Sequence, residues 1–154
     1  YTSRLASKHG YKIRTVSYGT LPENVKGDPE KMKQAFDLAL EQTERSLGSI
    51  DWNSYGSILF ISKSIGTVIS SAYAVKSILF TPLAETFSFP LAGSIAFHGT
   101  ADPWAETNSI RELAAQKDVP LFLTQNANHS LETGDVLTDI FILKTTMERV
   151  QRFI

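Results

Sequence analysis

The sequence contains no cysteine among its 154 residues. This absence excludes disulfide bonds, thiolate metal sites and a cysteine nucleophile. It leaves the compartment open, and a reducing cytoplasm is the simpler expectation. The sequence also lacks any apolar run near the ~20 residues that a membrane-spanning helix needs, so a membrane is not an expected partner.

An excess of charge of either sign is missing as well. The 15 lysine and arginine residues nearly balance the 16 aspartate and glutamate residues, for a net charge of -1. Without a basic field, nucleic acid is not an expected partner. The 3 histidines lack the spacing of a metal site, and the P-loop and the Gly-x-Gly-x-x-Gly motif are both absent. We therefore expect neither a metal nor a cofactor.

What the sequence does contain is an alternation of short apolar segments and amphipathic segments. Strands are expected at 12–18, 57–62, 78–81, 94–98 and 120–124, and helices at about 29–47, 65–74, 106–116 and 136–153. Alternation of this kind favours right-handed βαβ units in a three-layer α/β/α sandwich with a mostly parallel sheet. No linker or repeat interrupts the pattern, so residues 1–154 are expected to form one domain.

The helix at 29–47 has the clearest boundaries. Asp28 has the chemistry of an N-cap, Pro29 suits the first helical position, and Gly48 follows the last apolar residue of the pattern. In the last helix, Ile140, Leu143, Met147 and Val150 are expected to form the apolar face.

A serine stands at the turn between the second expected strand and its helix. Ser64 lies in the motif Ser62-x-Ser64-x-Gly66. A serine hydroxyl is a poor nucleophile until a base activates it, and a sharp strand-to-helix turn lifts the hydroxyl clear of the sheet. The pentapeptide alone is a weak signal, because Ser64 could equally be an ordinary N-cap.

Two polar residues follow later strands. Asp102 lies in a turn after the strand at 94–98, and His129 lies in a polar loop after the strand at 120–124. A carboxylate can fix the tautomer of an imidazole, which can then accept a serine proton. Taken alone, Asp102 is a turn former and His129 a solvated loop residue. The order Ser, Asp, His is more specific, since each separation spans about one βα unit.

The segments Ile61–Gly66, His98–Trp104 and Asn126–Ser130 follow one another in the chain order of the α/β-hydrolases. From about residue 12 to its end, the chain resembles a small bacterial-type member of that superfamily. The resemblance implies a minimal α/β-hydrolase fold, with N-terminal strands short or missing, and a catalytic triad of Ser64, Asp102 and His129. Ser62 departs from the family motif, which has glycine at this position.

The resemblance also implies an oxyanion hole. The backbone N–H of Ile65, directly after the nucleophile, would be one donor. The second donor in this family comes from a loop after an earlier strand, and we expect that loop upstream of Tyr1. The stretch from the Ser64 helix to Ser94 has no room for a lid domain, which favours small, soluble substrates.

The loop after the strand at 78–81 is expected at the ligand-binding edge of the sheet. The candidates to line a substrate pocket there, or simply to cap the sheet, are Leu83, Glu85, Thr86, Phe87 and Trp104. His98, at a strand end, is expected to be structural. Lys63 is expected to form an ion pair rather than to act in catalysis.

Two functions of different class follow from these observations. The first is a serine hydrolase that cleaves a small ester, thioester or related acyl bond through an acyl-enzyme. The second is a non-catalytic hydrolase-like scaffold that binds a ligand. A flavodoxin-like or receiver domain is a weaker third hypothesis. The phosphate loop of flavodoxin-like domains and the clustered acidic residues of receiver domains are not found in this sequence.

Overall fold

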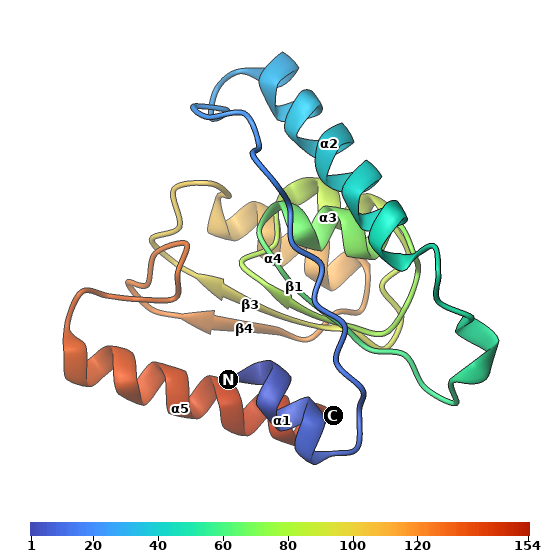
Figure 1. Ribbon diagram of the computed structural model, residues 1–154. Coiled ribbons are helices and arrows are strands. Elements are labelled where there is room, and N and C mark those ends of the chain that lie inside the picture. Colours follow the sequence, from blue (N-terminus) through green and yellow to red (C-terminus); the bar gives the residue numbers. More distant parts are fainter. The chain divides into compact units, whose positions relative to one another are not determined.

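A computed structural model describes all residues, Tyr1–Ile154 (Figure 1). The chain divides into two compact units, and we describe each by itself. The first unit comprises residues 1–13 and 59–154, and the second comprises residues 14–58. The single domain expected from the sequence stays a prediction.

The first unit is built on a parallel sheet of four strands. The strands are β1 (Phe60–Lys63), β2 (Ser77–Phe80), β3 (Ile95–Gly99) and β4 (Leu121–Thr124). They pair in the order β1-β2-β3-β4, and every pairing is parallel. Because all four strands run in the same direction, their carboxyl ends lie at one edge of the sheet. That edge is where the turns carrying Ser64, Asp102 and His129 begin.

Side chains along each strand alternate between two apolar layers. In β2, Leu79 packs with Ala96 of β3 and Ile110 on one face, while Ile78 packs with Phe97 and other residues on the opposite face. Parallel strands buried on both faces are expected to be mainly apolar, and the two central strands carry the buried residues Ile78, Leu79, Ile95, Ala96 and Phe97.

Helices cover both faces of this sheet (Figure 1). On one face lie α3 (Ile65–Ser71), the short 3₁₀ helix η2 (Ala84–Ser88) and α4 (Thr107–Gln116), and on the other lie α1 (Thr2–Lys8) and α5 (Val136–Phe153). The fold is therefore the expected α/β/α sandwich with a mostly parallel sheet.

A stack of three phenylalanine rings joins the sheet to α5. Phe80, Phe97 and Phe122 occupy paired positions on β2, β3 and β4, and successive ring centroids are 5.2 Å apart. The guanidinium of Arg149 on α5 lies 4.4 Å from the centre of the Phe122 ring. Aromatic pairs of this geometry stabilise a core beyond the area that they bury.

The second unit contains α2 (Pro29–Leu47) and the 3₁₀ helix η1 (Trp52–Ser54). The predicted boundaries of α2 are confirmed: the Asp28 carboxylate accepts a hydrogen bond from the Lys31 N–H, Pro29 is the first residue, and Gly48 is the C-cap. The side chain of Arg14 donates to the carbonyl of Ser46, which ties the start of this unit to the end of α2.

Two expectations from the sequence are wrong, and one helix is present that the sequence did not predict. Residues 12–18 form no strand, because a strand needs a neighbour for its backbone hydrogen bonds and the sheet ladder begins only at Phe60. The helix α1 was not expected at all, and its Leu5 packs in the apolar layer beneath α5. On α5 itself, Met147 and Val150 reach the core, whereas the other two residues of the expected apolar face, Ile140 and Leu143, are 59% and 36% exposed. None of the helices has the length and apolar composition that crossing a bilayer requires.

Candidate active site

Ser64 occupies a strained turn between β1 and α3. Its backbone angles are φ 54° and ψ -128°, outside the regions that residues with a side chain normally occupy. The Ser64 N–H donates to the carbonyl of Phe80 on β2, at 3.1 Å, which extends the sheet ladder to the turn itself. A strained backbone conformation persists only where the surrounding structure stabilises it, and such conformations cluster at functional sites.

The Ser62 side chain, where the family motif has glycine, reaches across to α3. Its hydroxyl lies 2.8 Å from the Ser70 hydroxyl, and Ser70 in turn donates to the carbonyl of Thr67. A small hydroxyl side chain thus replaces glycine while still letting strand and helix approach closely, and it adds a hydrogen bond between them.

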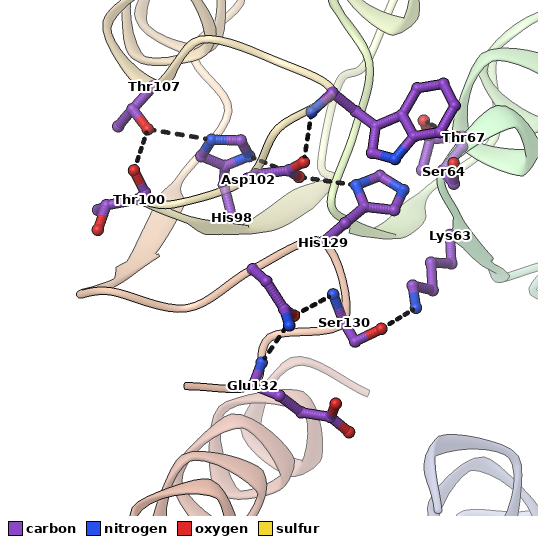
Figure 2. A network of polar contacts seen from close by, with 12 residues as sticks. Lys63, Ser64, Thr67, His98, Thr100, Asp102, Thr107, His129, Ser130 and Glu132 are labelled. Atoms are coloured by element: carbon purple, nitrogen blue, oxygen red, sulfur yellow. Dashed lines mark hydrogen bonds and ion pairs between the residues drawn. The ribbon is translucent and has the colours of Figure 1, made fainter. Parts of the chain in front are cut away.

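Asp102 and His129 form a direct hydrogen bond (Figure 2). The Nδ1 of His129 is 2.8 Å from Oδ2 of Asp102, whose side chain is completely buried. Because a carboxylate oxygen accepts hydrogen bonds, Nδ1 is the donor of this pair, and in the neutral imidazole Nε2 is then the nitrogen that has the lone pair. That Nε2 atom is buried without a hydrogen-bond partner, and in Figure 2 it points to the side of the site on which Ser64 lies.

The other carboxylate oxygen of Asp102 also accepts a hydrogen bond. Oδ1 accepts the backbone N–H of Trp104 at 2.9 Å, so the carboxylate closes a turn on its own loop. The two hydrogen bonds fix the carboxylate in one rotamer, aimed at the imidazole. The indole of Trp104 lies beside that imidazole, with ring centroids 5.8 Å apart.

The loops that carry Asp102 and His129 are bonded to each other along their length. The Ala101 N–H donates to the carbonyl of Ala127 at 2.9 Å, and the Asn126 N–H donates to the Thr100 hydroxyl at 2.8 Å. Gly99 lies between them, and a Cβ atom there would stand 2.2 Å from the Ala127 carbonyl oxygen. Glycine at residue 99 is therefore what lets the histidine loop approach the acid.

A second histidine lies beneath the acid. His98 is completely buried, with Nδ1 3.8 Å from Oδ2 of Asp102 and Nε2 3.3 Å from the Thr107 hydroxyl. Since that hydroxyl donates to the carbonyl of Thr100, it accepts from the Nε2–H of His98. Burial lowers the pKa of His98 below its ordinary value, so the ring is neutral at pH 7 and does not compete with His129 for the carboxylate.

The residues expected to line a pocket fall into two groups. Leu83 is buried, Phe87 is buried within an apolar cluster, and Thr86 is fully buried with its hydroxyl bonded to Thr67. Glu85 is exposed and Trp104 is 38% exposed. Burial favours the capping alternative for the first three residues, whereas Trp104 has the exposure and the position beside His129 that a substrate contact needs.

Ile65 is the first residue of α3, so its backbone N–H has no partner within the helix. Lys63, the residue before Ser64, forms no ion pair; its ammonium group lies 3.4 Å from the hydroxyl of Ser130, the neighbour of His129. This contact bridges β1 and the loop that carries His129. No group of His, Asp or Glu side chains is arranged to hold a metal ion.

Comparison with known proteins rests on structure rather than sequence. No protein-family model matches the chain, and no curated protein matches it. Among solved structures, a protein from Xanthomonas campestris pv. campestris assigned to the α/β superfamily of hydrolases aligns with TM-score 0.61 over 96% of this chain and 87% of its own, at 13% identity. The chain has the α/β-hydrolase fold.

Two further structures agree with this α/β-hydrolase fold. A protein of unknown function from Agrobacterium tumefaciens, assigned to the α/β-hydrolases, aligns with TM-score 0.58 over 95% of this chain and 73% of its own, at 15% identity. A Xanthomonas campestris protein described as an α/β serine hydrolase without a lid aligns with TM-score 0.56 over 98% of this chain and 70% of its own, at 13% identity. At these identities the comparisons establish the fold alone.

Sequence reasoning missed three residues that shape this site. The sequence predicts a strand end at Gly99 and a structural role for His98, but not their closeness to the Ala127 carbonyl and to Asp102, and it predicts no role for Thr67. The run of hydroxyl residues at Thr67, Ser70 and Ser71 in an otherwise apolar helix was an available signal, because buried hydroxyls need partners.

Proposed function

We propose that this chain is a serine hydrolase that cleaves a small ester, thioester or related acyl bond. The observation that carries the proposal is the hydrogen bond from His129 to the buried Asp102, which leaves Nε2 of the imidazole unpaired. A partly buried, oriented imidazole with a free lone pair is what a general base requires.

In the proposed reaction the Ser64 hydroxyl attacks the acyl carbonyl and its proton passes to Nε2 of His129. Asp102 stabilises the imidazolium that forms, and the N–H of Ile65 donates to the developing oxyanion. Collapse of the tetrahedral intermediate releases the protonated leaving group and leaves an acyl group on Ser64. Water, deprotonated by His129, then attacks the acyl-enzyme, releases the acid and restores the serine.

The strained conformation of Ser64 supports its role as the nucleophile, since this is the backbone geometry of a nucleophile elbow. Substrates are proposed to be small molecules, because only the five-residue helix η2 stands between β2 and the loop before β3. A cytoplasmic location stays a prediction.

Labelling with a fluorophosphonate probe tests the proposal. Intact mass should show one adduct on the wild-type protein and none on Ser64→Ala, with peptide mapping to Ser64. Ser130→Ala is the matched control, because Ser130 is an exposed serine beside the same histidine, and it should still be labelled. If the wild-type protein takes up no adduct, the alternative of a non-catalytic binding scaffold is favoured.

A further inference from the structure

A chain of two buried hydroxyls leads from η2 to the backbone of Ser64. The Thr67 hydroxyl donates to the carbonyl of Ser64 at 2.7 Å, and the Thr86 hydroxyl lies 2.6 Å from the Thr67 hydroxyl. Since the single hydroxyl proton of Thr67 is used on Ser64, the second bond must be donated by Thr86. The direction of the chain is therefore from Thr86 to Thr67 to Ser64.

These two hydrogen bonds hold the peptide unit after Ser64, whose orientation is set by the unusual ψ angle of Ser64. On the other side, the Ser64 N–H is held by Phe80. The Ser64 carbonyl accepts both the N–H of Thr67, at 2.8 Å, and the Thr67 hydroxyl. Both peptide units that flank Ser64 are thus fixed by hydrogen bonds.

Burial makes these bonds effective. Thr67 and Thr86 are both completely buried. Water cannot replace a lost bond at such a site, so removing one partner leaves the other hydroxyl unsatisfied.

Thr43 in α2 provides a comparison. It is also buried, and its hydroxyl also donates to a carbonyl one turn earlier, that of Ala39, at 2.8 Å. Its acceptor is an ordinary helical residue, whereas the acceptor of Thr67 is a residue with φ 54° outside the helix.

We infer that Thr67 and Thr86 are positioning residues that hold the Ser64 turn in its reactive conformation. The inference rests on the proposed function of Ser64. It gives Thr86 a role different from the substrate contact expected from the sequence, and it makes η2 part of the support of the nucleophile. Neither threonine is assigned contact with the reacting atoms.

The experiment measures the rate constant of fluorophosphonate labelling at Ser64, at a temperature where every variant is fully folded. Thr67→Val keeps the side-chain shape and removes the hydroxyl, and it should slow labelling about tenfold, the effect of one to two lost buried hydrogen bonds. Thr86→Val leaves the bond from Thr67 to Ser64 intact and should slow labelling about threefold. Thr67→Ser keeps the hydroxyl and should react within about twofold of the wild type.

Thr43→Val is the matched control, because it removes the same kind of bond from a different helix. It should lower the melting temperature and leave the labelling rate unchanged. If Thr67→Val labels as fast as Thr43→Val, the positioning role is overturned, since a merely structural threonine would affect stability alone.

Amide hydrogen exchange gives a readout that does not depend on activity. In Thr67→Val the Ser64 amide should exchange faster than in Thr43→Val, because the turn is less well held. If the wild-type protein is not labelled but this acceleration is seen, the proposed function fails and the positioning role stands. If the acceleration is absent, the positioning role fails whatever the labelling shows.

Discussion

The backbone of Gly99 lies directly against Ala127, so that a Cβ atom at residue 99 would stand 2.2 Å from the Ala127 carbonyl oxygen. Gly99→Ala must therefore push the histidine loop away from the acid. We expect a loss of about 1–3 kcal/mol of folding stability, as for other overpacked sites. We also expect a loss of at least about 100-fold in kcat/KM, since a displacement of about 1 Å at a catalytic group has that effect.

Gly56→Ala is the control for this change, because nothing lies within 4 Å of a Cβ atom there. Thermal unfolding and hydrolysis of p-nitrophenyl acetate measure the two effects. Unchanged kinetics in Gly99→Ala would mean that the approach of the two loops has no part in the activity.

Asp102→Asn tests the acid. An amide can present its N–H group to Nδ1 of His129, which favours the wrong tautomer and leaves Nε2 protonated. We expect kcat at pH 7 to fall by about 10⁴-fold, with little change in melting temperature. Asp37→Asn, which removes an exposed partner of Lys33, should leave kcat unchanged. Full activity in Asp102→Asn would exclude Asp102 as the triad acid.

His98 should give the folded state a characteristic dependence on pH. Burial lowers the pKa of His98 below the ordinary value of about 6.5, so the unfolded chain binds this proton more readily than the folded chain. The contribution of His98 to the free energy of unfolding is therefore fully present above pH 6.5. It decreases as the pH drops below 6.5, by at most about 1.4 kcal/mol per pH unit. Neighbouring Asp102, His129 and Glu106 also act on this proton.

Urea unfolding between pH 8 and pH 5 measures this dependence. His98→Gln removes the titration and should flatten the curve relative to the wild type. His9→Gln, which changes an exposed histidine, should not. Parallel curves for the wild type and His98→Gln would show that His98 does not contribute to the pH dependence of the free energy of unfolding.

Trp104→Ala tests the predicted substrate contact. The indole is 38% exposed and lies 5.8 Å from the His129 ring, so its loss should weaken substrate binding. We expect KM for p-nitrophenyl acetate to rise about tenfold, within the range for one apolar contact, and kcat to change less. Tyr55→Ala removes an aromatic side chain that is 43% exposed in the other unit and should leave KM unchanged. An unaltered KM in Trp104→Ala would remove Trp104 from the binding site.

The sequence predicts best what is encoded locally. The caps of α2, at Asp28 and Gly48, and the span of α5 follow from residues within a few positions of each end. The parallel strands follow from apolar runs separated by helices. The order of Ser64, Asp102 and His129 also lies in the sequence and predicts that Asp102 and His129 meet, and the hydrogen bond between their side chains agrees with it.

What the sequence does not reveal depends on contacts between distant segments. Residues 12–18 have the pattern of a strand, but the pattern cannot say whether a partner strand lies beside them. The close approach of Gly99 to Ala127 and the hydroxyl chain from Thr86 are likewise invisible without the fold. The exposure of Ile140 arises because only the later turns of α5 reach the sheet, which helical periodicity cannot distinguish.

The hydrogen bonds between the Thr100–Ala101 turn and the Asn126–Ala127 turn hold Asp102 and His129 together within one continuous segment, residues 95–129, which we call the cassette. The acid, the base, the glycine contact and the links between the two turns all lie within this one continuous segment. Grafting the cassette onto another scaffold of the same fold would carry the acid–base geometry with it, and only the register with the serine turn would have to be engineered anew.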